Sequence, residues 1–188
     1  MRWLTRAGAA AALAVGLATI WGFGWRGLVL VLAFFVSGSL LTPERGGGRR
    51  RNARQVVANG GVAALAALAG SWPAFAGAIA AATADTWATE IGRHSKRAPR
   101  LISTWKQVSP GTDGGITLLG TAGGIAGAAV IAGLSFALGR PLPVAAGVIG
   151  MLFDSLLGAT VQGAVSWLDN DAVNLAATLA GAAVAIAW

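Results

Sequence analysis

The chain has 188 residues, of which 55% are hydrophobic and 11% charged, and its mean hydropathy is +0.67. These values exclude an ordinary soluble domain, in which about 25% of the residues are charged. Cysteine is absent, which excludes disulfides and thiolate metal sites. The net charge of +7 fits anchoring at a membrane surface and phosphate binding better than it fits a nucleic-acid partner.

Seven apolar segments, separated by short polar breaks, are predicted to form helices. They cover residues 7–21, 27–41, 56–70, 73–91, 116–138, 142–161 and 172–188. Several are shorter than the roughly 20 residues that cross a bilayer upright, so tilted helices or a thinned bilayer are expected. The first is interpreted as a retained helix, because no convincing signal-peptide cleavage site follows it. The sequence therefore predicts one integral membrane domain over residues 1–188, an all-α bundle of about seven transmembrane helices.

The charged residues indicate how this bundle is oriented. Twelve of the fourteen Lys and Arg residues fall on one side of the predicted membrane, and only Arg26 and Arg140 fall on the other. Basic loops face the cytoplasm, so we expect a cytoplasmic N-terminus, an external C-terminus and a location in the cytoplasmic membrane. All seven acidic residues lie on the same side or in the adjacent third of the membrane. Both signs of charge on one face favour chemistry at the cytoplasmic boundary over passage of a solute.

The third segment opens with a polar stretch. Arg51, Gln55 and Asn59 recur every four residues and therefore share one helical face, with Arg54 beside them. Unpaired amides are unfavourable at the membrane entrance, so this face is expected to meet a polar ligand. Neighbouring Arg49 and Arg50 are instead expected to anchor anionic lipid.

Two carboxylates are predicted to lie at the same depth of the membrane. Asp85 follows Pro73 by twelve residues, and Asp154 follows Pro143 by eleven. At a rise of about 1.5 Å per residue, both lie roughly 16–18 Å below the outer surface, in the cytoplasmic half. Ionised carboxylates there require a cation, a proton or a basic partner. The shared depth favours a hard divalent cation such as Mg²⁺ over pairing with an arginine or protonation.

Glu90 lies about one turn beyond Asp85 and shares a helical face with Thr86. It has two interpretations. It completes the metal shell or binds a substrate hydroxyl, or it pairs with Arg93 or Arg97 near the end of the helix.

A glycine-rich turn, residues 109–115, precedes the fifth apolar segment. Glycines allow successive backbone N–H groups to point at one anion, and a helix N-terminus adds positive potential. Lys106 and Arg100, just upstream, strengthen the case for phosphate binding. The alternative is an N-cap turn in which Thr112 or Asp113 caps the helix.

Residues 169–174 form a second dense polar set, at the start of the last segment. Helix capping accounts for one aspartate, but it does not account for four polar side chains. The remaining members are therefore candidates for binding phosphate.

Read together, these segments resemble the transmembrane protein 19 / domain-of-unknown-function 92 family, which includes the plant phytyl-phosphate kinase. The resemblance rests on RNARQV at 51–56, DTWATEIG at 85–92, PGTDGG at 110–115, DSLLGATVQ at 154–162 and DNDAVN at 169–174. Shorter matches at 37–42, 59–61, 95–96 and 99–102 extend it over almost the whole chain.

The resemblance implies an Mg²⁺-dependent prenyl (phytyl or polyprenyl) phosphate kinase that transfers a γ-phosphoryl group, with CTP as the expected donor, to a lipid monophosphate at the cytoplasmic face. Catalysis is assigned to Asp85, Glu90, Asp154 and Lys106, with the three carboxylates as metal ligands. Phosphate and nucleotide binding is assigned to Arg51, Asn52, Arg54, Gln55, Asn59, Lys96, Arg100, Gly111, Thr112, Asp113, Gly114, Gly115, Asp169, Asn170 and Asn174. The expected partners are the nucleoside triphosphate, the prenyl phosphate and membrane lipids, without nucleic acid.

Two other functions remain open at this point. A lipid-phosphate cytidylyl or phospho-alcohol transferase would use the same metal and phosphate groups but would release pyrophosphate or CMP. A carrier or flippase for lipid phosphates would need polar residues leading to the outer face, where the sequence offers only Arg140 and a few small hydroxyls.

Overall fold

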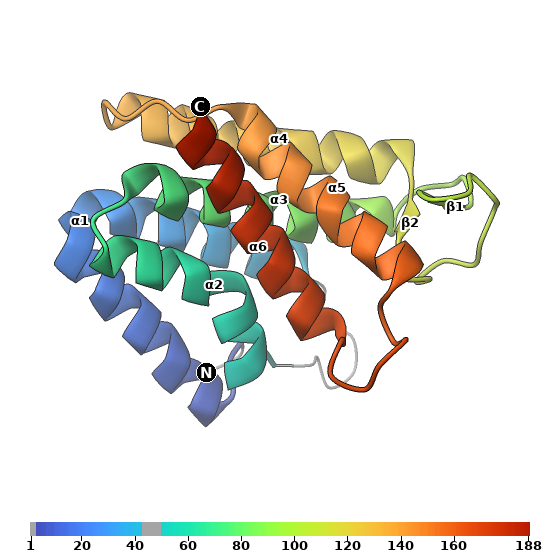
Figure 1. Cartoon of the computed structure of the whole chain (residues 1–188), viewed down its shortest axis with the longest axis horizontal. Coiled ribbons are helices and arrows are strands. Elements are labelled where there is room, and N and C mark those ends of the chain that lie inside the picture. Colours follow the sequence, from blue (N-terminus) through green and yellow to red (C-terminus); the bar gives the residue numbers. More distant parts are fainter. Residues whose placement is uncertain (1–2, 43–49) are drawn as a thin grey trace.

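The computed structural model describes residues 3–42 and 50–188, which form an almost entirely helical bundle (Figure 1). In chain order the elements are α1 (Arg6–Leu41), α2 (Ala53–Leu68), α3 (Trp72–Gly92), β1 (Arg100–Leu101), β2 (Gly115–Ile116), α4 (Leu118–Ala137), α5 (Val144–Thr160) and α6 (Asn170–Ala187). The predicted all-α class is confirmed. Arg2, Arg45 and Arg49, which contribute to the predicted cytoplasmic charge, lie outside the described residues.

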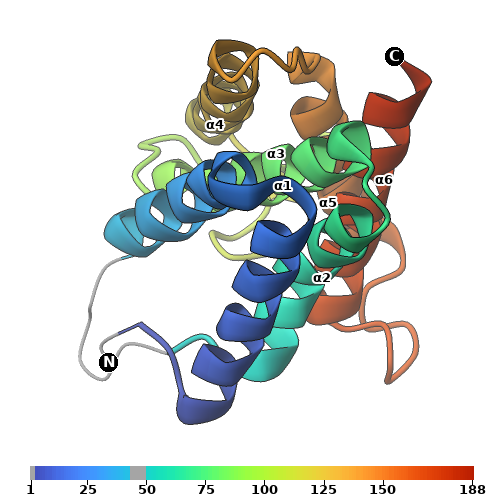
Figure 2. The same ribbon diagram turned by 90° about the vertical axis from the view of Figure 1, so that its left-hand side faces the viewer.

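Helix α1 contains the break that the sequence predicts between its first two apolar segments. Gly24 has φ 60° and ψ −145°, a backbone conformation that is not helical and that suits glycine because it has no Cβ. The two arms of α1 on either side of Gly24 run in different directions (Figure 2). The predicted seven segments therefore correspond to six α-helices in the described part of the chain, the first of them bent.

Helix α3 lies at the centre of the bundle and packs against each of the other helices (Figure 2). Its buried positions are mostly alanine and glycine, which let neighbouring backbones approach closely. The Cα of Gly77 faces the carbonyl of Gly181 in α6, and Gly124 of α4 lies against the carbonyl of Ala84. This close packing fixes the positions of the side chains that α3 presents to its neighbours.

The end of α3, the start of α4 and the end of α5 meet at one end of the bundle, beside the short antiparallel pair β1–β2 (Figure 1). Helix α4 begins later than the sequence predicted. Its N-cap is Thr117, whose Oγ1 accepts a hydrogen bond from the backbone N–H of Gly120 at 3.0 Å. The prediction that Thr112 or Asp113 caps this helix is wrong, because strand β2 lies between them and α4.

By length and composition, α1, α4 and α6 are long and apolar enough to cross a membrane, and α5 is a shorter apolar helix. Large apolar side chains on these helices are exposed, including Leu13, Leu118 and Leu179. Such an outer surface is unfavourable in water and favourable in lipid.

The tryptophans divide between this outer surface and the core. Trp21 and Trp25 are exposed, as expected for residues at a membrane interface. Trp72, in contrast, is 5% exposed. Its indole Nε1 donates to Ser135 Oγ at 2.9 Å, and its ring packs against Phe75. Trp72 therefore belongs to the core.

Candidate functional site

A cavity of about 340 Å³, here called the acidic cavity, lies between α3, α4, α5 and the segment that joins α3 to α4. Its volume is within the roughly 300–1,000 Å³ typical of small-molecule sites. The charged residues that line it are Asp85, Arg93, Arg97, Asp113 and Asp154. Other members are Thr89, Ser95, Gly111, Thr112, Gly114, Gly115, Thr117, Gly120, Ser155, Gly158, Gln162 and Asn170.

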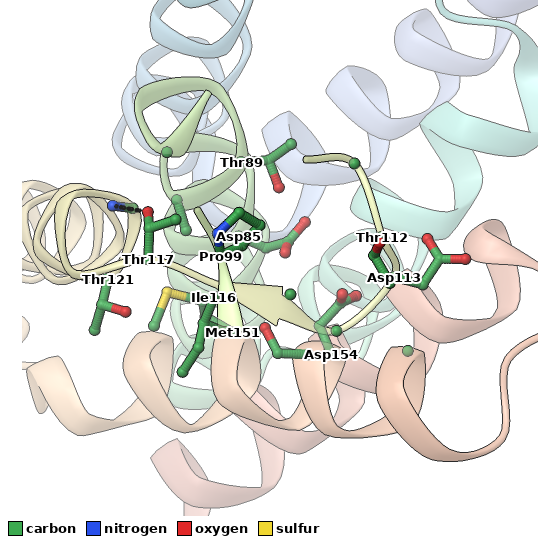
Figure 3. A pocket seen from close by; sticks show the side chains of 18 of the residues that line it. Asp85, Thr89, Pro99, Thr112, Asp113, Ile116, Thr117, Thr121, Met151 and Asp154 are labelled. Atoms are coloured by element: carbon green, nitrogen blue, oxygen red, sulfur yellow. Dashed lines mark hydrogen bonds between the residues drawn. The ribbon is translucent and has the colours of Figure 1, made fainter. Parts of the chain in front are cut away.

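Asp85 of α3 and Asp154 of α5 point their carboxyl groups into the same space (Figure 3). Asp154 is close enough to Asp85 and Asp113 to be repelled by both when they are ionised. Its Oδ2 is buried and has no hydrogen-bond partner among the described residues. Two adjacent carboxylates with an unsatisfied oxygen suit a hard divalent cation. The structure thus brings together the two residues for which the sequence predicted equal depth.

Glu90, the predicted third metal ligand, is not with them. Its Oε2 accepts from Arg93 Nη1 at 2.8 Å, and its Oε1 accepts from Thr42 Oγ1 at 3.2 Å. Among the described residues, no group of three His, Cys, Asp or Glu side chains is placed to hold a metal ion. The three-carboxylate set is therefore corrected to the pair Asp85 and Asp154. Such a pair is still suitable, because Mg²⁺ is usually held by one or two carboxylates together with substrate phosphates.

The basic side chains at the acidic cavity differ from those predicted. Arg93 and Arg97 line it, whereas the predicted Lys96, Arg100 and Lys106 are exposed and do not. Arg100 Nη1 donates to the carbonyl of Trp105 at 2.8 Å instead. No helical period runs through this segment, so the sequence does not indicate which basic residues turn inward.

The glycine-rich turn lines the acidic cavity through residues 110–115, and phosphate binding by it stays a prediction. Gly114 has φ 71°, and its Cα faces the backbone of Ser155 and Ala159 so closely that a Cβ would collide. Thr112 Oγ1 donates to the carbonyl of Ser109 at 2.8 Å. The turn is therefore folded against α5 and presents backbone to the cavity.

Gln162 and Ser155 line the acidic cavity but were not among the predicted site residues. A sequence signal for Gln162 existed, because it follows Asp154 and Gly158 at a spacing of four residues, although it lies just beyond the end of α5 at Thr160. All three residues line the cavity.

A second cavity of about 310 Å³, here called the apolar cavity, lies between the two arms of α1 and α2. Its apolar lining is Leu4, Ala12, Val15, Leu28, Val31, Leu32, Phe34, Phe35, Val56 and Ile79, with Gly16 and Gly60. Its polar members are Arg51, Gln55, Asn59, Thr86 and Asn174. Four of these five, all except Thr86, were predicted to bind phosphate, but they lie apart from the predicted metal residues.

Arg51 is partly buried in this second cavity. Its guanidinium carbon lies 5.7 Å from the ring centroid of Phe34 and 5.8 Å from that of Phe35. Burial lowers the pKa of Arg51, and the charge of Glu90 opposes this effect. Glu90 itself lines neither cavity, but it pairs with Arg93, which lines the acidic cavity.

Three remaining predicted residues have structural roles. Asn52 caps α2 by accepting from the N–H of Gln55 at 3.0 Å. Arg54 is exposed and pairs with Asp169 at 2.8 Å and with Asp171 at 3.7 Å. Asp169 caps α6, as one aspartate of this set was expected to do.

Comparison with known proteins places these features in a family. Residues 1–182 match the family described as integral membrane protein DUF92. An uncharacterized membrane protein of Methanocaldococcus jannaschii is 34% identical over 92% of this chain and 80% of its own length. One from Synechocystis is 32% identical over 89% and 76%. The chloroplastic protein VTE6 of Arabidopsis thaliana is 29% identical over 97% of this chain and 64% of its own length. No solved structure matches.

Proposed function

This chain belongs to the integral membrane protein family DUF92, and we propose that it is a prenyl-phosphate kinase whose active site faces the cytoplasm. The proposal includes seven membrane crossings, with α1 crossing twice and the N-terminus inside. The observation that carries it is the placement of Asp85 and Asp154, from separate helices, in one cavity with Arg93, Arg97 and a glycine-rich turn. The resemblance to the family of the plant phytyl-phosphate kinase supplies the reaction class.

The acidic cavity has the groups that a nucleoside triphosphate requires. Arg93 and Arg97 bind phosphate oxygens, and the backbone of residues 111–115 lies against the same space. Asp85 and Asp154 would hold Mg²⁺, which when bound neutralises charge on the triphosphate. We assign CTP as the donor on the basis of the family resemblance alone.

The reaction forms a bond between an oxygen of the acceptor monophosphate and the γ-phosphorus of the donor. The bond from the γ-phosphorus to the β,γ-bridging oxygen breaks, which gives the nucleoside diphosphate and a prenyl diphosphate. An acceptor phosphate is already ionised, so no dedicated general base is needed. The side chains therefore act by aligning the two phosphates and by stabilising their charge.

The test is phosphoryl transfer by the purified protein in nanodiscs. It is incubated with Mg²⁺, CTP or ATP labelled in the γ-phosphate, and phytyl, geranylgeranyl or longer prenyl monophosphates. The expected product is a labelled prenyl diphosphate, which EDTA and the variant Asp154→Asn prevent. Asp171→Asn, which removes a carboxylate outside both cavities, should remain active.

Product analysis separates the alternatives. Release of pyrophosphate or CMP would show that the protein is a cytidylyl or phospho-alcohol transferase and that the kinase assignment is wrong. Absence of any nucleotide turnover, together with movement of labelled prenyl phosphate across the bilayer, would show that the protein is a carrier.

A further inference from the structure

We propose that the apolar cavity holds the hydrocarbon chain of a single-chain prenyl monophosphate, with the phosphate bound by Arg51. This inference rests on the proposed function, because it names the acceptor site of that kinase. It concerns a cavity that the carboxylate pair does not line, and it assigns the two substrates to different, neighbouring sides of α3.

The walls of the cavity suit one hydrocarbon chain. Ala12 and Gly16 come from the first arm of α1, and Val31 and Phe35 come from the second. The bend at Gly24 directs these two arms differently and thereby leaves room between them. A volume of about 310 Å³ is at the lower end of small-molecule sites, which favours one chain over the two chains of a common phospholipid.

In this proposal the lipid enters beside Leu32. This side chain lines the cavity and is 47% exposed. A lipid can therefore enter sideways from the bilayer, without passing through water.

Arg51 supplies a charge that suits an anion. Among the described residues its side chain makes no salt bridge and no hydrogen bond, and the carboxylate of Glu90 pairs with Arg93. It lies over the rings of Phe34 and Phe35, a contact that leaves the in-plane N–H groups of the guanidinium available to phosphate oxygens. Gln55 and Asn59 line the same polar region.

This polar region lies next to the acidic cavity. Arg51 Nη2 and the methyl group of Thr86 both lie against Gly38, at 2.9 and 3.1 Å from where a Cβ would stand. Thr86 follows Asp85 directly in α3. Measured along the axis of α3, a phosphate bound by Arg51 therefore lies within about one helical turn of Asp85, whose carboxylate faces the donor.

The experiment measures binding of radiolabelled geranylgeranyl monophosphate to the full chain in nanodiscs, without nucleotide. Gly16→Phe fills the cavity from a position where a Cβ has no neighbour within 4 Å. Its matched control is Gly133→Phe, because Gly133 is equally free of neighbours and lies on α4 away from the cavity. Arg51→Gln removes the charge, and Arg50→Gln, at an exposed residue, is its control.

We expect Gly16→Phe and Arg51→Gln to weaken binding by about tenfold or more, while both controls stay within about twofold of the wild type. Arg51→Gln should leave the affinity for uncharged geranylgeraniol unchanged, since only the phosphate meets Arg51. Gly16→Leu, a smaller block, should give an intermediate loss and guards against misfolding of the phenylalanine variant.

Unchanged binding by Gly16→Phe and Gly16→Leu would overturn the inference, and so would the absence of binding to the wild type. Equal displacement of the label by phosphatidic acid would also overturn it, in favour of a general phospholipid site. If the expected pattern holds but neither CTP nor ATP is turned over, the lipid site stands and the proposed kinase function fails.

Discussion

Asp85 and Thr86 are consecutive residues of α3, yet Asp85 lines the acidic cavity and Thr86 lines the apolar cavity. Successive residues of an α-helix are about 100° apart around its axis, so neighbours can face different sides. Helix α3 therefore forms part of the wall of both cavities. Donor and acceptor phosphates bound on these two sides would meet near the C-terminal end of α3, where Glu90 lies.

The carboxylate pair gives the first prediction. Asp85→Asn and Asp154→Asn should each lower kcat by roughly 100-fold or more, because metal stabilisation of charge contributes several kcal/mol and each 1.4 kcal/mol is a factor of ten. Binding of geranylgeranyl monophosphate should be unchanged. The measurement is Mg²⁺-dependent phosphoryl transfer by monodisperse protein, with Asp171→Asn as the control. Normal turnover by both variants would contradict the assignment of Asp85 and Asp154 as metal ligands.

Glu90 gives the second prediction, because its two interpretations have different kinetic effects. It accepts hydrogen bonds from Arg93 and Thr42, so we assign it the role of positioning Arg93. Glu90→Gln should raise the KM for the nucleotide by about fivefold, equivalent to about 1 kcal/mol, and leave the Mg²⁺ requirement unchanged. A rise of about tenfold in the Mg²⁺ needed for half-maximal activity would instead make Glu90 a metal ligand.

The sequence predicted the proximity of Asp85 and Asp154 better than the directions of side chains around the helix axes. Twelve and eleven residues separate Asp85 and Asp154 from their prolines, so the rise per residue puts them at a similar level, and both line one cavity. The face of a helix depends on residue spacing. Residues 85, 88, 89 and 92 share a face and line the acidic cavity, whereas Glu90, five residues from Asp85, is turned away by about 140°. The five-residue spacing between Asp85 and Glu90 already predicts that the two side chains face different directions.

The loop residues were harder to predict, because no periodicity relates a loop side chain to a cavity. Lys96 and Arg97 are adjacent in the sequence and similar in charge, but only Arg97 lines the acidic cavity. The path of this segment depends on the pairing of β1 with β2, which joins residues about fifteen apart. That contact is tertiary, and local sequence does not reveal it.

The loop arginines give the third prediction. Arg97→Gln should weaken nucleotide binding by roughly ten- to a hundredfold, the loss expected for a charged hydrogen bond to phosphate. Lys96→Gln removes the same charge one residue away and should have a much smaller effect. Equilibrium binding of a non-hydrolysable nucleotide measures both. A larger effect at Lys96 would restore the original sequence prediction for that residue.

Close packing at the centre of the bundle gives the fourth prediction. A Cβ at Gly77 would collide with the carbonyl of Gly181 and lie 2.6 Å from Cβ of Ala185. Gly77→Ala should therefore force α3 from α6 and lower the free energy of unfolding by about 1–3 kcal/mol. Gly133→Ala makes the same change where no atom lies within 4 Å. The Tm of Gly133→Ala in detergent should stay at or above the wild-type value, because alanine favours the helix more than glycine does.

The N-cap of α6 gives a prediction for pH dependence. Asp169 Oδ1 accepts from the N–H groups of Asp171 and Ala172, and Oδ2 accepts from Arg54. The hydrogen bond from Ala172, with the charge of Arg54, lowers the pKa of Asp169 below its ordinary value of 3.8. A carboxylate with a lowered pKa in the folded state stabilises that state above the unfolded pKa, and the effect is lost as the pH falls through the folded pKa.

Asp169→Ala should therefore have a lower Tm than the wild type at pH 6, and the difference should shrink as the pH falls below about 3.8. Asp169→Asn should lose less at pH 6, because its amide oxygen still caps the helix while the charge interaction with Arg54 is gone. Thermal unfolding in detergent across this pH range measures both variants. A difference between wild type and Asp169→Ala that stays constant down to pH 3 would mean that the ionised carboxylate does not stabilise the start of α6, and would attribute the effect of the substitution to lost packing.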